Sequence, residues 1–210
     1  MSIVEGTITL FVGYLFGCFQ TSYIISKLVS KKDIRNLGSG NAGASNVTSE
    51  FGWKYGILTG LIDILKAYLP AKIALYYFID ILQPLDIIVL AGTGAILGHI
   101  YPLFLNFRGG KGIACYIGML LAIDLQIGLI TILTLMLITI ITDYVSIGSI
   151  FLYIFIPIYT YISGEYSLLI IRCVSILCLV GLIKHWINIQ RIINGNETGL
   201  RDVYNKNKSN

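Results

Sequence analysis

The chain has 210 residues, of which 56% are hydrophobic and 12% charged, and its mean hydropathy is +0.79. Soluble globular domains carry about twice that share of charged residues, so the composition excludes a soluble protein and predicts a polytopic membrane protein. The net charge of +4 does not indicate nucleic-acid binding, because the basic residues of a membrane protein gather on one face of the bilayer.

Apolar segments follow one another along the chain. A helix that spans a bilayer needs about 20 mostly apolar residues, and seven segments meet or approach this length, at 3–29, 55–79, 85–101, 112–123, 127–141, 144–162 and 168–183. We therefore predict an all-α membrane protein with seven transmembrane helices. They would form a single membrane domain over residues 1–195, followed by a polar, frayed tail over 196–210.

The charges between these segments predict the orientation. With the N-terminus outside, one face of the membrane receives Lys27, Lys31, Lys32, Arg35, Lys54, Arg108, Lys111, Lys184, Arg191, Arg201, Lys206 and Lys208. The opposite face receives Glu5, Asp80, Asp86, Asp124 and Glu165. The positive-inside rule then places the C-terminus in the cytoplasm. The same arrangement brings three polar segments, 38–49, 98–112 and 184–197, to the cytoplasmic side, where we expect them to form one site.

The first polar segment, 38–49, begins with glycines and small polar residues. Its glycines let backbone N–H groups approach a ligand closely, while hydroxyl and carboxamide side chains such as Ser39 and Asn41 donate hydrogen bonds without adding charge. This pattern suits a phosphate or a glycerol group. A flexible linker is the alternative interpretation.

The second polar segment, 98–112, combines glycines with His99, Arg108 and Lys111. Converging backbone N–H groups and the start of the following helix favour an oxyanion, and the two cations add a forked donor and a point charge. His99 could act as a base, orient a carbonyl or bond the backbone. A basic turn that only reaches the lipid headgroups is the alternative.

The third polar segment, 184–197, places His185 and Asn188 on one helix face, with Arg191 following. Glu197 could orient Arg191 or Lys184 through an ion pair. The alternative is an ordinary helix end that favours cations.

One ionisable pair lies inside an apolar segment. Asp63 and Lys66 are three residues apart, so they share a helix face, and charged groups at membrane depth are candidates for function or for a structural pair. The four cysteines lack metal-ligand spacing, and we expect neither a metal nor a cofactor.

In this order, three motifs resemble those of the bacterial acyl-phosphate:glycerol-3-phosphate acyltransferases. They are GSGNAGASNV at 38–47, GHIYPLFLNFRGGKG at 98–112, and KHWINIQR at 184–191 with Gly195 and Glu197 following. The resemblance covers nearly the whole chain. It implies a seven-helix membrane enzyme of phospholipid biosynthesis that transfers a fatty acyl group from acyl phosphate to the 1-hydroxyl of glycerol 3-phosphate.

The resemblance also implies roles for residues. Ser39 and the backbone of the first motif would hold phosphate, Lys111 would bind glycerol 3-phosphate, and His185 and Asn188 would line the site near the reacting groups. Together with the residue patterns, it predicts Ser39, Lys111, His185 and Asn188 as catalytic and Gly38, Gly40, Asn41, Ser45, Asn46, Lys66, His99, Arg108, Gly109, Gly110, Arg191 and Glu197 as substrate-binding. Acyl phosphate, glycerol 3-phosphate and membrane lipids are the expected partners; the oligomeric state is left open, and a monomer is compatible with the sequence.

The chain departs from the family pattern at several positions. Ser49 replaces an arginine expected to grip glycerol 3-phosphate, Cys18 and Gln20 replace serine and proline, and Ala67 replaces glycine. These changes leave open a divergent paralogue that is weakly active or inactive. A transporter of phosphorylated small molecules is a further alternative, although segment 127–141 has only threonine as its polar groups.

Overall fold

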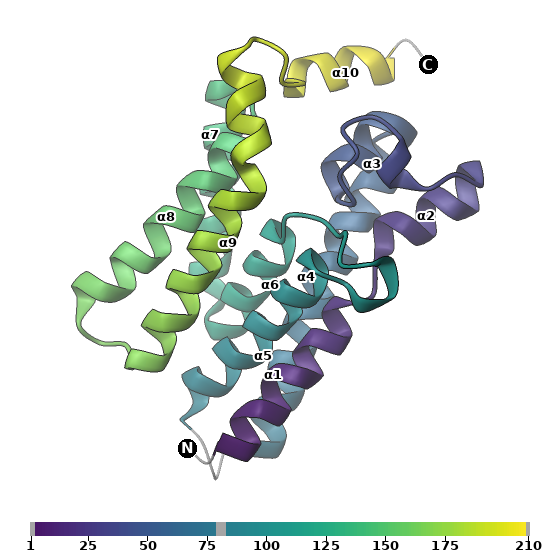
Figure 1. Cartoon of the computed structure of the whole chain (residues 1–210). Coiled ribbons are helices and arrows are strands. Elements are labelled where there is room, and N and C mark those ends of the chain that lie inside the picture. The colour runs from purple at the N-terminus through teal and green to yellow at the C-terminus, as the bar shows by residue number, and fades with distance from the viewer. Residues whose placement is uncertain (1–2, 79–82, 209–210) are drawn as a thin grey trace. The chain divides into compact units, whose positions relative to one another are not determined.

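The computed structural model describes residues 3–78 and 83–208, and all of its regular structure there is helical (Figure 1). Five of the described helical segments are long and apolar enough to cross a membrane: Ile3–Ser30, Pro84–Leu105, Leu125–Thr142, Val145–Ser163 and Leu168–Ile193. The prediction of an all-helical membrane protein is therefore confirmed. Ile79, the predicted end of the second span, and Asp80 lie outside the described residues.

Two further predicted spans differ from these five. Helix α4 (Trp53–Phe78) has 26 residues but contains Lys54, Asp63, Lys66 and Lys72, and α6 (Ile113–Ile123) is apolar but has only 11 residues. The count of seven spans includes both, so it stays a prediction.

The chain divides into two compact units, residues 1–128 and 129–210. The first contains α1 (Ile3–Gly17), α2 (Thr21–Ser30), the 3₁₀ turn η1 (Ile34–Asn36), α3 (Ala44–Phe51), α4, α5 (Pro84–Ile100), the 3₁₀ turn η2 (Leu103–Leu105) and α6. The second contains most of α7 (Leu125–Thr142), α8 (Val145–Ser163), α9 (Leu168–Ile193) and α10 (Leu200–Lys208).

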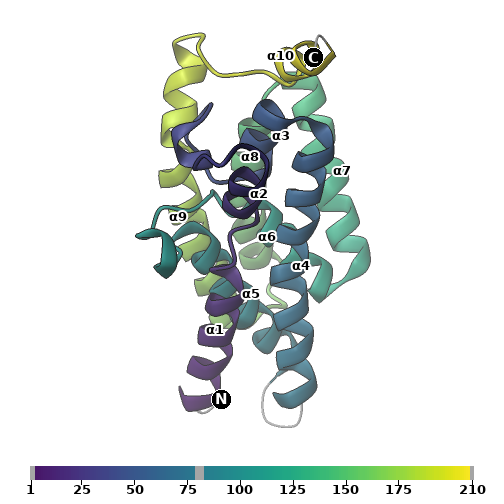
Figure 2. The same ribbon diagram turned by 90° about the vertical axis from the view of Figure 1, so that its right-hand side faces the viewer.

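Helix α5 forms the centre of the first unit and is buried along most of its length. Glycines allow α1 to lie directly against it (Figure 2). A Cβ atom at Gly13 or Gly17 of α1 would overlap a backbone carbonyl of α5, and a Cβ atom at Gly94 or Gly98 of α5 would overlap one of α1. Small residues four apart on both helices are the usual way to bring helices together in lipid, where burial of apolar surface gives no driving force.

The first apolar segment is not one helix, as the sequence predicts, but two. The backbone leaves helical geometry between α1 and α2, and the carbonyl of Phe19 accepts a hydrogen bond from Lys66 Nζ of α4 at 2.7 Å. A break in a helix is tolerated at membrane depth only where its freed backbone groups find partners within the protein. Lys66 supplies that partner.

In the second unit, α7 exposes much of its apolar surface, including Leu133, Met136 and Ile140, as expected of a helix that faces lipid. The prediction of a frayed tail is wrong, because residues 200–208 form α10. Asp143 accepts hydrogen bonds from the backbone N–H groups of Leu200 (2.7 Å, through its carbonyl) and Arg201 (2.9 Å, through Oδ1), which anchors the start of this helix.

Candidate active site

Hydrogen bonds of the Asn46 side chain hold the first polar segment, 38–49, which we call the first glycine-rich segment, in its fold. Its Nδ2 atom lies 3.2, 3.0 and 3.0 Å from the carbonyl oxygens of Ile34, Leu37 and Asn41, and its Oδ1 accepts a hydrogen bond from Ser39 N at 3.0 Å. The side chain is buried, so its amide shapes the loop. Ser39 and Ser45 are exposed on the same segment, as are Gly38 and Gly40, while Asn41 is half-buried.

The second segment folds back onto the end of α5. Gly109 N donates to the carbonyl of Ile100 and Gly110 N to the carbonyl of His99, both at 3.1 Å. Arg108 is exposed, and the half-buried Lys111 lies two residues before the start of α6 at Ile113.

Gly110 marks the point where the two glycine-rich segments meet. A Cβ atom at this residue would overlap His99 Nε2 and lie 2.7 Å from the carbonyl oxygen of Ala42 in the first segment. Only glycine leaves room for this approach. The structure thus brings 38–46 and 98–112 together at this point, whereas their predicted role in a substrate site stays a prediction.

A buried cluster of Asp63, Lys66 and His99 lies behind this contact. The Lys66 ammonium has three N–H donors, and they face Asp63 Oδ1 (2.9 Å), Phe19 O (2.7 Å) and His99 Nδ1 (2.8 Å). Because an ammonium can only donate, Nδ1 of His99 accepts, and the ring proton is on Nε2, which faces Gly110. Lys66, predicted to bind substrate, is only 5% exposed and is surrounded by protein acceptors.

Thr21 and Gln20 make further hydrogen bonds to this cluster. Thr21 Oγ1 donates to Asp63 Oδ1 at 3.2 Å, and Gln20 Nε2 lies 3.1 Å from the carbonyl of His99 and 3.2 Å from that of Gly17. Gln20, one of the departures from the family pattern, therefore supports His99 from the break between α1 and α2. Its Oε1 atom has no hydrogen-bond partner among the described residues.

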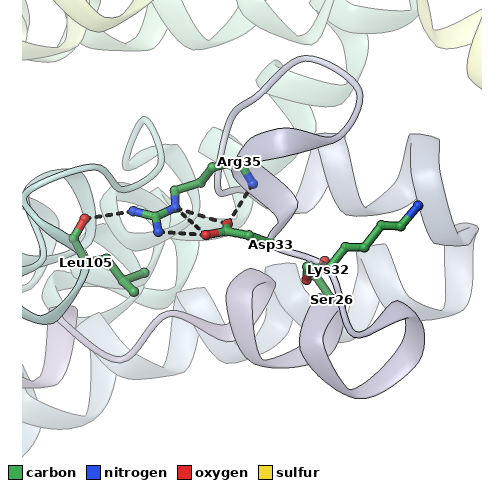
Figure 3. Close-up of polar contacts among 5 residues, drawn as sticks. All are labelled: Ser26, Lys32, Asp33, Arg35 and Leu105. Carbon is green, nitrogen blue, oxygen red and sulfur yellow. Dashed lines mark hydrogen bonds and ion pairs between the residues drawn. The ribbon is translucent and has the colours of Figure 1, made fainter.

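Arg35, which the sequence placed only among the basic residues of one face, links η1, just before the first glycine-rich segment, to the second segment (Figure 3). Its guanidinium binds the Asp33 carboxylate and donates from Nη1 to the carbonyl of Leu105 at 2.8 Å. The hydrogen bond from Arg35 holds the pKa of Asp33 below its ordinary value, and Asp33 in turn raises the pKa of Arg35. In the sequence, only the Asp-x-Arg spacing of Asp33 and Arg35 could have indicated this ion pair.

The third polar segment lies in the second unit. His185 and Asn188 are both buried on α9, which agrees with their predicted common face. His185 Nδ1 lies 2.8 Å from the carbonyl oxygen of Gly181. A carbonyl can only accept, so Nδ1 carries a proton, and in a neutral ring Nε2 is the acceptor atom.

Glu197 has different partners from those predicted. Its Oε1 atom accepts hydrogen bonds from Asn188 Nδ2 at 2.6 Å and from Ser146 Oγ of α8 at 3.2 Å. The sequence analysis considered Arg191 or Lys184 instead, and it missed Ser146 as part of this network. Glu197 thus orients Asn188. That the third segment shares one site with the first two stays a prediction.

Known proteins match this chain over most of its length. A family model described as glycerol-3-phosphate acyltransferase matches residues 7–195. Glycerol-3-phosphate acyltransferase 1 of Oceanobacillus iheyensis is 41% identical over 207 residues, covering 94% of this chain and 96% of the relative. The glycerol-3-phosphate acyltransferase of Thermosipho melanesiensis is 38% identical, and the match covers 92% of each chain.

Crystal structures of a related enzyme also match this chain. The crystal structure of PlsY (YgiH), an integral membrane glycerol 3-phosphate acyltransferase, in its glycerol 3-phosphate form matches with a TM-score of 0.82 and 32% identity, covering 92% of this chain and 94% of that one. Its lysophosphatidic acid form matches with a TM-score of 0.80 and 31% identity, covering 95% and 98%.

Proposed function

The chain belongs to the glycerol-3-phosphate acyltransferase family, and we propose that it transfers a fatty acyl group from acyl phosphate to the 1-hydroxyl of glycerol 3-phosphate. The products would be lysophosphatidic acid and inorganic phosphate. The observation that carries the proposal is the contact of two glycine-rich segments at Gly110, next to Lys111. The similar PlsY structures are described as glycerol 3-phosphate and lysophosphatidic acid forms, which correspond to a substrate and a product of this reaction.

The reaction proceeds by direct transfer. The glycerol hydroxyl attacks the acyl carbonyl carbon, the new ester C–O bond forms, and the bond from that carbon to the phosphate oxygen breaks. Phosphate is a good leaving group, so catalysis rests on positioning and on stabilising the negative charge that develops. The Ser39 hydroxyl and Lys111 serve that purpose in the first unit, since the N–H groups of Ser39, Gly109 and Gly110 already donate to protein acceptors. A covalent acyl adduct on Ser39, detected by mass spectrometry, would refute direct transfer.

In the second unit, His185 and Asn188 have the chemistry to act on the reacting groups. Nε2 of a neutral His185 can accept the hydroxyl proton, and the carboxamide of Asn188 is held by Glu197. The leaving phosphate of the acyl donor can equally accept this hydroxyl proton. That all three segments serve one substrate pair rests on the family resemblance of the three motifs.

We further propose that the protein is a bacterial cell-membrane protein whose N-terminus is outside and whose three motifs face the cytoplasm, as the distribution of basic residues predicts. In intact cells, a membrane-impermeant maleimide should label a Glu165→Cys variant but label a Lys208→Cys variant only after permeabilisation. Labelling of Lys208→Cys in intact cells would invert the proposed orientation.

The function is tested by lysophosphatidic acid formation with purified protein, acyl phosphate and labelled glycerol 3-phosphate over a wide concentration range. We expect turnover with a high KM for glycerol 3-phosphate, because Ser49 of α3 replaces the family's arginine. Ser49→Arg should lower this KM about ten- to a hundredfold, the value of one charge-assisted hydrogen bond.

The matched control is Asn205→Arg, which adds the same charge on exposed α10 and should leave KM unchanged. Absence of turnover in the wild type and in Ser49→Arg, even at saturating substrate, would refute the acyltransferase assignment and favour an inactive paralogue.

A further inference from the structure

We propose that Arg35 is a positioning residue that clamps the loop before Lys111 to the first glycine-rich segment and thereby sets Lys111 for phosphate binding. The inference rests on the proposed function. Arg35 lies in η1, three residues before Gly38, whereas Leu105 lies in η2, six residues before Lys111. The hydrogen bond from Arg35 Nη1 to the carbonyl of Leu105 thus joins two residues that are 70 apart in the sequence, one just before the first segment and one within the second.

The guanidinium is aimed at Leu105 by its other contacts (Figure 3). Nε lies 3.0 Å from Asp33 Oδ1 and Nη2 lies 2.7 Å from Asp33 Oδ2, so one edge of the fork is occupied by a carboxylate. The guanidinium carbon also lies 5.8 Å from the centre of the Tyr23 ring. Because the fork is planar and rigid, fixing one edge fixes the direction of Nη1.

The loop that Arg35 holds is strained. Asn106 and Phe107 have φ angles of 54° and 58°, in the left-handed region that side chains other than glycine rarely adopt. Such a conformation persists only where the surroundings hold it. The carbonyl of Leu105 accepts from Arg35 and also from Arg108 N at 3.2 Å, so the clamp is placed at the turn itself.

Loss of the clamp should therefore act on substrate binding through the loop. From Arg108 the chain continues through Gly109 and Gly110, whose N–H groups bond the end of α5, to Lys111. If the turn relaxes, these amides exchange faster and Lys111 spends less time in its binding position. The KM for glycerol 3-phosphate rises, whereas kcat changes little, because bound substrate at saturation holds Lys111 in that position.

The experiment compares wild type with Arg35→Gln and Arg35→Lys by steady-state kinetics and by hydrogen–deuterium exchange of residues 103–112. Arg35→Gln should raise KM about tenfold, with kcat within about threefold, and accelerate exchange of the loop amides about tenfold. Arg35→Lys, which keeps the charge but not the fork, should give intermediate values. Asp33→Asn retains Arg35 but weakens its aim, so it should shift both readouts in the same direction and serves if Arg35→Gln does not fold.

Lys32→Gln is the matched control, because Lys32 is an exposed lysine three residues before Arg35 whose side chain points away from Leu105 (Figure 3). It should leave both readouts unchanged. A raised KM without faster exchange would show that Arg35 acts on the substrate directly, and faster exchange without a raised KM would separate the loop from binding; either result overturns the inference, as does no change in both. A wild type without turnover would refute the proposed function, whereas the exchange rates test the clamp independently.

Discussion

Replacement of Lys111 by methionine is expected to lower kcat/KM for acyl transfer about 10²–10³-fold while the protein still inserts and folds. Lys111 follows the two glycines that bond the end of α5, in a segment fixed by Gly110 against His99. A cation held there by a rigid backbone needs no reorganisation when negative charge develops on the transferring group, and removing one such donor typically costs this much. The measurement is steady-state kinetics of lysophosphatidic acid formation.

Lys32→Met is the matched control, because Lys32 is an exposed lysine of the same unit. It should retain wild-type kcat/KM. Lys111→Arg keeps the positive charge and should recover part of the activity. A Lys111→Met variant with activity within threefold of wild type would exclude Lys111 from the catalytic machinery.

The sequence predicted the features that depend on local spacing and hydropathy. The apolar segments became helices at nearly the expected positions, and the i, i+3 pairs Asp63–Lys66 and His185–Asn188 each share a helix face. Ala42 of the segment 38–49 lies next to Gly110 of the segment 98–112, but the prediction that all three polar segments form one site stays a prediction.

Features that depend on distant partners were not predictable from the same signals. The break between α1 and α2 lies within one continuous apolar segment, and its stabilising donor is Lys66, 47 residues later. The tail reads as disordered from its polar composition, yet α10 is anchored by Asp143, 58 residues earlier than Arg201. Asn46 was predicted as a ligand donor, but the three carbonyls that occupy its amide depend on the path of the whole loop.

Replacement of Lys66 by methionine is expected to destabilise the protein by about 3–5 kcal/mol, seen as a fall in Tm of about 10 °C in detergent. The change would leave the Asp63 carboxylate, which is 2% exposed, without its cation, and would leave the carbonyl of Phe19 and Nδ1 of His99 without a donor. An uncompensated charge in a low-dielectric interior is costly, and the break between α1 and α2 depends on the same ammonium.

Lys72→Met provides the control on the same helix, because Lys72 makes a cation–π contact with Tyr68, 5.8 Å from the ring centre. Its loss should cost at most about 1 kcal/mol. The double variant Asp63→Leu/Lys66→Met removes both charges, so it should be more stable than Lys66→Met alone, and the difference measures how much of the cost arises from the orphaned carboxylate. If Lys66→Met melts no lower than Lys72→Met, the buried cluster does not hold the helix break together, and Lys66 is then available for the substrate-binding role that the sequence motif predicts.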